Sequence, residues 1–169
     1  MNKKDAEKQQ IIIFKLDEKL YGVNIDQVRE ITRVGEISPV PKAPKYVLGV
    51  TNLRGQITTV IDLRKRLGMQ PKTIDKQSRM MIIEAEGNSE GVIVDSVVEV
   101  TMIPKADIEE PPKIMESSKN KSNYLVGIGK KDNKLIILLD LKKLLSPEAL
   151  IKAHVIEPQL EMKVNASPT

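Results

Sequence analysis

Histidine and cysteine, the side chains that most often act as nucleophiles, general bases and zinc ligands, are nearly missing from this sequence. The 169 residues include no cysteine and a single histidine, His154. A Ser-His-Asp triad or a multi-histidine metal site therefore has too few residues to form, and no thiolate can bind zinc. We expect no catalytic residue, no metal site and no cofactor.

Two other patterns could carry chemistry but have simpler interpretations. Gly127 and Gly129 form an isolated G-x-G, without the G-x-x-x-x-G-K-[ST] sequence of a phosphate-binding loop. Adjacent carboxylates such as Glu109 and Glu110 could act as an acid and a base, but nothing in the sequence puts them in a buried site. The sequence therefore predicts a protein that is not an enzyme.

Basic residues leave nucleic-acid binding open as an alternative. The chain has 27 lysines and arginines against 23 acidic residues, and its formal net charge of +4 is spread along the sequence. Clusters within residues 64–66 and 130–134 could contact phosphate, yet neither has interleaved aromatic side chains for base stacking. A small basic β-barrel that binds RNA is the alternative function, and a solvated surface is the simpler interpretation.

Signals for a membrane location are also lacking. No apolar run approaches the ~20 residues that a spanning helix needs, and the opening MNKKDAEKQQ has no apolar segment typical of a signal peptide. The lack of cysteine suits a reducing compartment. A cytoplasmic protein without direct membrane insertion is the expectation.

An internal repeat organises the chain. Residues 48–63 align without a gap on residues 126–141, at an offset of 78 that places Asp62 on Asp140. Residues 21–31 align on residues 90–100 at an offset of 69. Two related units therefore fill the sequence, the first over about 10–70 and the second over about 78–145.

Each unit has the pattern of five short strands separated by turns. We expect strands at 11–16, 21–25, 29–32, 46–50 and 57–63, and at 80–85, 91–95, 96–100, 124–129 and 134–141. About five strands per unit favours two tandem small barrels, a mainly β fold. Asp62 and Asp140 can each cap a short helix, and Ser146-Pro147 predicts a C-terminal helix at about 146–156. Residues 1–9 and 158–169 read as polar, disordered tails.

The turn in NLRGQ carries a cation that the repeat does not require. The second unit has Lys-Lys-Asp-Asn (130–133) where the first has Asn-Leu-Arg-Gly (52–55), and Asp132-Asn133 suits a turn with positive φ. An exposed Leu53-Arg54 pair is the composition of an interface anchor. The alternative is that Arg54 lies along the barrel wall with its head in water.

Four separated motifs resemble the CheW-type chemotaxis coupling proteins, over roughly residues 10–150. They are YGVNIDQVREI, ISPVPKAPKYVLGVTNLRGQITTVIDLRKRLG, GVIVDSVVEV and YLVGIGKKDNKLIILLDLKKLL. The family fold, two five-stranded SH3-like barrels around a shared core, agrees with the repeat. Thr59 stands where the family often has proline. We expect a stand-alone coupler, because the sequence shows neither the receiver domain of the CheV type nor the ATP-binding region of a CheA kinase.

The resemblance implies two partners and two binding surfaces. The partners are the cytoplasmic tip of a methyl-accepting chemotaxis receptor and the regulatory domain of the histidine kinase CheA, in membrane-associated arrays. The receptor-binding residues would lie in the groove between the barrels: Asn52, Leu53, Arg54, Val97 and Val100. The kinase-binding residues would lie on a rim of the first barrel: Val28, Glu30, Ile31 and Gly49. We expect a monomer in isolation and kinase binding that survives the loss of Arg54. Exchange of strands between the barrels is left open.

Overall fold

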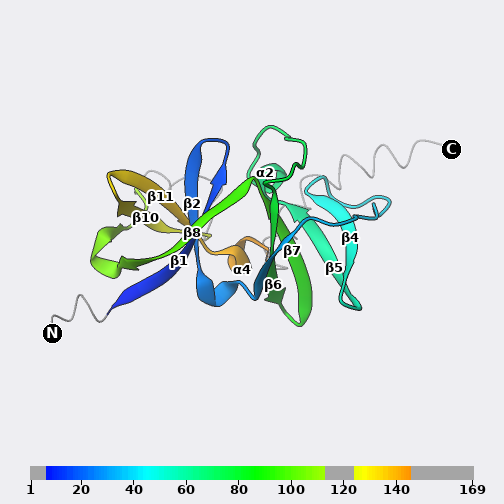
Figure 1. Ribbon diagram of the computed structural model, residues 1–169, viewed down its shortest axis with the longest axis horizontal. Helices are drawn as coiled ribbons and strands as arrows, with labels where there is room; N and C mark the ends of the chain where they lie inside the picture. The colour runs from blue at the N-terminus through cyan, green and yellow to red at the C-terminus, as the bar shows by residue number, and fades with distance from the viewer. Residues whose placement is uncertain (1–6, 113–123, 146–169) are drawn as a thin grey trace.

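The computed structural model describes residues 7–112 and 124–145, which form two β-sheets side by side (Figure 1). The six-stranded sheet has the order β8-β1-β2-β11-β10-β9. Its strands are β1 (Lys8–Leu16), β2 (Lys19–Asn24), β8 (Ser96–Pro104), β9 (Ile108–Glu109), β10 (Leu125–Lys131) and β11 (Lys134–Leu139). The five-stranded sheet has the order β3-β6-β7-β5-β4. Its strands are β3 (Glu30–Arg33), β4 (Val47–Leu53), β5 (Gln56–Asp62), β6 (Arg79–Ala85) and β7 (Asn88–Val94).

The strands predicted from the sequence are all present, and the mainly β class is confirmed. The two-residue strand β9 was missed, because it lies among prolines and is too short for an alternating pattern. β1 begins at Lys8, so residues 8 and 9, which we expected in the N-terminal tail, pair with Pro104 and Ile103. The expected C-terminal helix at 146–156 and the tail after it lie outside the described residues.

The two sheets do not correspond to the two sequence units. β1 and β2 pair with strands of the second unit, whereas β6 and β7 pair with strands of the first. The units of about 10–70 and 78–145 therefore describe the repeat, and each one gives its first hairpin to the other unit's sheet. The exchange runs through two parallel pairs with equivalent registers, in which Leu138 lies opposite Gly22 and Val60 lies opposite Gly91.

Some of the exchanged strands are apolar on both faces, and the exchange buries both of those faces. In β1, Ile11 and Ile13 pack in a cluster formed by the six-stranded sheet alone, and Ile12 and Phe14 pack on the opposite face, against the five-stranded sheet. The described residues form one hydrophobic cluster inside each sheet and a larger central cluster between the sheets. The central cluster includes Ile12, Phe14, Leu16, Val23 and Leu139 from one sheet and Ile61, Met81, Ile83, Val92 and Val94 from the other. This shared apolar core holds the sheets together.

Short helices follow the two capping aspartates, as predicted. In α2 (Leu63–Arg66), Asp62 Oδ1 accepts from Arg64 N at 3.0 Å, and in α4 (Leu141–Leu144), Asp140 Oδ1 accepts from Lys143 N at 3.0 Å. α4 lies between the sheets in Figure 1. Single-turn 3₁₀ helices η1 (Ile25–Gln27) and η2 (Lys105–Asp107) precede β3 and β9.

Within the described residues, the chain crosses from one sheet to the other at two places. The first crossing runs from β2 through η1 to β3. The second is a single residue, Asp95, between the end of β7 at Val94 and the start of β8 at Ser96. In the described residues, these two crossings are the places where the backbone connects one sheet to the other.

Candidate interaction surfaces

Metal-binding and membrane-spanning elements are not found in the parts of the chain that the structure describes. Over residues 7–112 and 124–145, no group of three His, Cys, Asp or Glu side chains could hold a metal ion. In the same residues, no helix has the length and apolar content to cross a bilayer.

The β4–β5 turn holds Arg54 in a backbone conformation that arginine rarely adopts. Leu53 pairs with Gln56, and the two residues between them, Arg54 and Gly55, have φ values of 51° and 85°. Asp132 and Asn133 occupy the equivalent turn at 50° and 63°, which confirms the positive φ predicted for them. Asn, Asp and Gly are favoured in such turns because they tolerate positive φ. The turn itself gives no reason for an arginine.

The neighbours of Arg54 support the turn. Asn52 Oδ1 accepts a hydrogen bond from Gly55 N at 2.8 Å, and Leu53 packs on the cluster inside the five-stranded sheet. Both were predicted as receptor contacts, but the Asn52 side chain is engaged within the hairpin and the Leu53 side chain is engaged with the cluster inside the sheet. Arg54 projects outward, with 69% of its side chain exposed.

Arg54 forms an ion pair with Glu30, the first residue of β3. The guanidinium donates to Glu30 Oε1. This hydrogen bond lowers the pKa of Glu30 below the ordinary glutamate value. The pair is therefore intact at neutral pH, and its contribution to stability is lost as the pH falls through that lowered pKa. The structure thus brings together one residue predicted for the receptor and one predicted for the kinase.

The second repeat has a similar pair, in which the glutamate is equivalent to Glu30 and the cation is one residue before the equivalent of Arg54. Glu99, which is equivalent to Glu30, accepts from Lys131 Nζ at 2.9 Å on the edge of the six-stranded sheet. In both sheets, a glutamate of one edge strand is tied to a cation at the end of a hairpin. Glu99 is therefore a close internal control for Glu30.

The other predicted kinase residues differ in their access to solvent. Ile31 is exposed on β3, and Val28 packs against the central cluster. Gly49 is buried at a φ of 148°, and a Cβ there would lie 2.7 Å from the carbonyl carbon of Ser38 and 2.9 Å from Pro39 Cα. A direct contact with Gly49 is not available on this structure, because the chain at Ser38 covers it.

A groove of about 510 Å³ opens beside β3 and β4, the edge strands of the five-stranded sheet. The chain after β3 meets β4 through the Ser38–Val50 bridge. The lining includes Thr32, Val50 and Ile57, and Ile57 is 73% exposed. An exposed apolar side chain beside edge-strand backbone is typical of a protein-binding surface.

An apolar strip runs along the exposed side of β8. Val98, Val100 and Met102 are 44%, 46% and 50% exposed. The pairing of β2, β1 and β8 puts Val100 in one row with Val23 and Ile12, which belong to the central cluster. The core between the sheets therefore continues to the surface along this edge strand.

Sequence analysis identified this strip only in part. Val97, predicted as a receptor contact, pairs with Phe14 and packs against the central cluster, while Val98 and Met102 were missed. A register shift between Ile13 and Phe14 displaces the alternation at the start of β8. The sequence signal that could have identified the strip is the spacing of Val100 and Met102, which are two residues apart and so lie on the same face of the strand.

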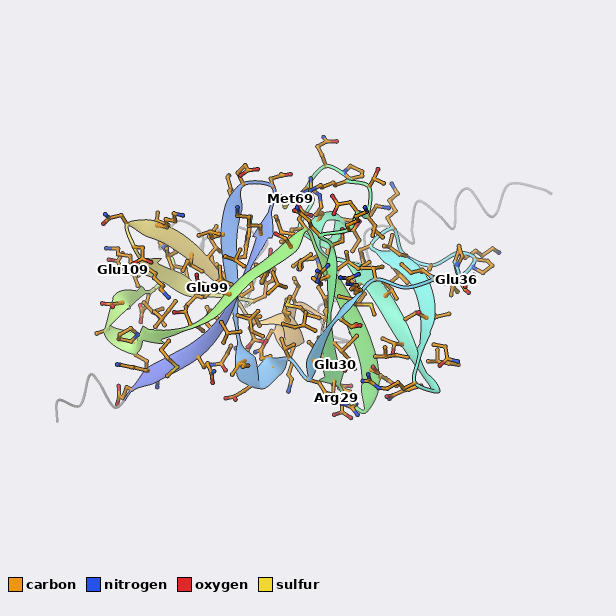
Figure 2. All side chains as sticks on the ribbon, in the orientation of Figure 1. Arg29, Glu30, Glu36, Met69, Glu99 and Glu109 are labelled. Carbon is orange, nitrogen blue, oxygen red and sulfur yellow. The ribbon has the colours of Figure 1, made fainter. Side chains whose placement is uncertain are left out.

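The predicted receptor residues lie on different sheets. Leu53 and Arg54 are at the β4–β5 turn of the five-stranded sheet, and Val97 and Val100 are on β8 of the six-stranded sheet. Figure 2 shows Glu30, the partner of Arg54, apart from Glu99, which neighbours Val100 in the sequence. The expected five residues thus form two separate sites.

The basic residues offered for RNA binding are largely engaged elsewhere. Lys130 and Lys131 are paired with Glu109 and Glu99 at 2.7 and 2.9 Å. Arg64 is 6% exposed, and Arg66 donates to Leu144 O at 3.3 Å. These contacts remove several of the cations that could have formed a phosphate-binding surface.

Comparison with known proteins gives one consistent family. The chain matches the family model described as CheW-like domain over residues 10–149. It is 32% identical to Chemotaxis protein CheW of Treponema pallidum over 150 residues, covering 86% of this chain and 87% of that protein. It is 32% identical to Chemotaxis protein CheW of Bacillus subtilis over 141 residues, covering 83% and 89%. The crystal structure of scaffolding protein TtCheW from Thermoanaerobacter tengcongensis matches with a TM-score of 0.74 at 38% identity, covering 83% and 94%.

Proposed function

The chain belongs to the CheW family of chemotaxis coupling proteins, and we propose that it joins a chemoreceptor tip to the regulatory domain of CheA through two surfaces that meet at the Arg54–Glu30 ion pair. Its role is that of a scaffold and not of a catalyst. We place it in the cytoplasm, at membrane-associated receptor arrays, and as a monomer when isolated. The observation that carries the proposal is the apolar core that reaches the surface along β8.

The receptor surface proposed here has two anchors. Val98, Val100 and Met102 offer an apolar strip whose burial by a partner is favourable. Arg54 offers a charged anchor at a turn position that its equivalent, Asp132, fills without a cation. Val97, on the same strand, packs against the central cluster and so ties the start of the strip to the core.

Val100→Glu should weaken binding of a receptor-tip fragment by about tenfold, because a carboxylate would have to be desolvated against an apolar partner. The binding of the CheA regulatory domain should not change. Leu135→Glu is the matched control, since Leu135 is exposed on the same sheet but away from the strip. The measurement is a pull-down followed by titration with each purified partner. Equal receptor affinity in the two variants would contradict the proposed surface.

The kinase surface proposed here is the groove beside β3 and β4. Ile57 in the lining of the groove and Ile31 on the neighbouring β3 supply exposed apolar side chains, and Glu30, the first residue of β3, supplies a carboxylate next to them. Val28 supports β3 from the central cluster, and Gly49 lets the chain at Ser38 lie close to β4.

Glu30→Lys should weaken the complex with the CheA regulatory domain by roughly fivefold to tenfold, since it places a cation beside Arg54 and Arg29. The free energy of unfolding should hardly change, because the lost ion pair is exposed. Glu99→Lys, which disrupts the equivalent pair, should leave kinase binding unchanged. If Glu30→Lys instead melts cooperatively at a much lower temperature than the parent, Glu30 has a structural role.

A further inference from the structure

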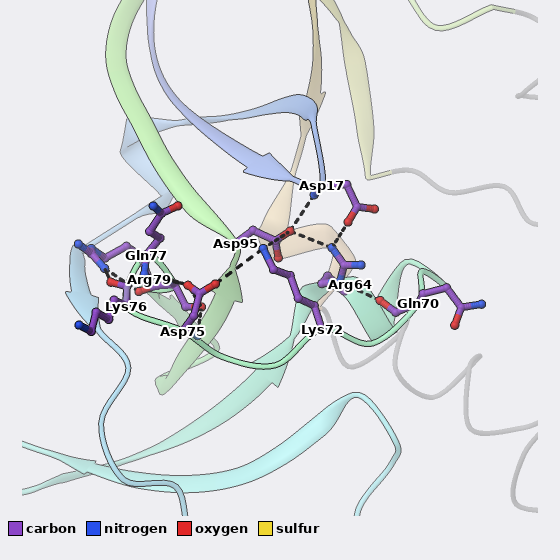
Figure 3. A network of polar contacts seen from close by, with 10 residues as sticks. Asp17, Arg64, Gln70, Lys72, Asp75, Lys76, Gln77, Arg79 and Asp95 are labelled. Carbon is purple, nitrogen blue, oxygen red and sulfur yellow. Dashed lines mark hydrogen bonds and ion pairs between the residues drawn. The ribbon is translucent and has the colours of Figure 1, made fainter.

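A network of polar contacts joins the two sheets around one buried arginine (Figure 3). Arg64 lies on α2, which follows the last residue of β5 in the five-stranded sheet. Its Nη1 donates to Asp17 Oδ1 and to Asp95 Oδ2, each at 2.8 Å, and its Nε donates to Gln70 O at 2.8 Å. Asp17 belongs to the β1–β2 turn of the six-stranded sheet. One guanidinium therefore connects both sheets.

Asp95 is both the buried partner of Arg64 and the single residue of the second crossing. Its Oδ2 also accepts from Asp17 N at 2.7 Å, and its own N–H donates to Lys15 O at 3.1 Å. Lys72 Nζ lies 3.7 Å from the same oxygen. The side chains of Arg64 and Asp95 are 7% and 9% exposed, so their charges are shielded little by water.

The first crossing has no comparable charged contact in the described part of the chain. The residue equivalent to Asp95 is Asp26, which is exposed in η1. The residue equivalent to Arg64 is Lys142, which is exposed on α4. Gln27 Oε1 accepts from Leu141 N at 2.8 Å, so a neutral amide holds this side. A short helix after the capping aspartate does not require a buried arginine, and Arg64 serves the contact between sheets.

Asp95 also directly precedes the strand that carries the apolar strip. β8 starts at Ser96, and Val98 is the third residue after Asp95. A change in direction at Asp95 would therefore move Val98, Val100 and Met102 relative to the five-stranded sheet. Both carboxylates accept from Nη1, and Nε of the same planar guanidinium donates to Gln70 O, so these three hydrogen bonds have fixed relative directions that the single nitrogen of an ammonium would not impose.

We propose that Arg64 is a positioning residue that fixes the β7–β8 crossing through Asp95 and Asp17, and thereby sets the orientation of the receptor-binding strip on β8. We call this network of Arg64, Asp95 and Asp17 the lock between the sheets, and it acts at the β7–β8 crossing only. Relative motion of the sheets would pivot at Asp95 and be taken up at the first crossing, in residues 25–29. The link to receptor binding rests on the proposed function, whereas the lock between the sheets does not.

The orientation of the sheets can be measured without any partner. The chain has no native cysteine, so Lys134→Cys and Glu84→Cys, both at exposed positions, allow one spin label on each sheet. Pulsed electron resonance should give a narrow distance distribution in the parent and a broader one in Arg64→Lys and Asp95→Asn. Asp26→Asn, at the equivalent position of the first crossing, should leave the distribution narrow. If Arg64→Lys does not fold, Asp95→Asn still carries the test, because the amide oxygen can accept from Asp17 N.

Receptor-tip affinity, measured on the same folded variants, tests whether the lock sets the orientation of the strip on β8. We expect it to fall about tenfold in Arg64→Lys and Asp95→Asn, a loss of about 1.4 kcal/mol, and to remain unchanged in Asp26→Asn. An unchanged distance distribution in folded Asp95→Asn would overturn the lock. A broader distribution with unchanged receptor affinity would overturn its link to the strip. A parent protein that does not bind the receptor tip would contradict the proposed function, and the distance measurement would still decide the lock.

Discussion

Arg54→Ala should weaken the receptor complex by about 30-fold, because loss of a buried, hydrogen-bonded interface arginine commonly costs about 2 kcal/mol. The substitution removes the packing of the aliphatic stem as well as the charged donors. The free protein should lose little stability, since the Arg54–Glu30 pair is exposed and the equivalent turn closes with Asp132. Titration of a receptor-tip fragment and a denaturant melt together measure the two effects.

The ion pair changes what Arg54→Ala should do to the kinase complex. From sequence we expected kinase binding to survive, because the two partners were assigned different residues. Arg54 holds Glu30 in place, so we now expect a smaller loss of kinase affinity as well, of about twofold to fivefold. Asp132→Ala is the matched control and should affect neither complex. Normal coupling by Arg54→Ala would leave Arg54 as a solvated surface residue.

Gly49→Ala should lower the free energy of unfolding by about 2–3 kcal/mol. A Cβ at this position meets the backbone of Ser38 and Pro39, which cannot move aside like a flexible side chain. The φ of 148° adds strain for any residue with a Cβ. Urea unfolding followed by circular dichroism measures the loss of stability. Kinase binding should also fall, because the added Cβ displaces the chain at Ser38 from the edge strand β4.

The chain supplies two controls for Gly49→Ala. Gly127 is the equivalent residue, and a Cβ there would lie 2.6 Å from Glu109 O, so Gly127→Ala should also be destabilising, but less so because Gly127 lacks the positive φ of Gly49. Gly35 is close in sequence to Ser38 but has open space around its Cβ position, so Gly35→Ala should change stability by less than about 0.5 kcal/mol. A mild Gly49→Ala variant that still lost kinase affinity would point to a contact role for this glycine.

Local patterns in the sequence predicted all the strands of the described residues except the two-residue β9, and both capped helices. Strands such as β1 and β6 are β-branched or apolar runs bounded by turn residues, and the capping aspartates Asp62 and Asp140 precede α2 and α4. The equivalence of Gly49 and Gly127 indicated the repeat, and the motifs along it identified the family. These features depend on neighbouring residues, through backbone preference and hydrogen bonds to the nearest turn.

The partners of those elements depended on the tertiary structure. Nothing in the β1–β2 hairpin says that it pairs with β8 and β11 of the other unit, because an apolar strand can be buried against any complementary edge. The same holds for single side chains. Arg64 read as one member of a surface cluster but is buried with Asp95, and Arg54 and Glu30, 24 residues apart, share one ion pair. Contacts between residues distant in sequence are decided by which faces the strand exchange brings together, and that choice is made by burial over the whole chain.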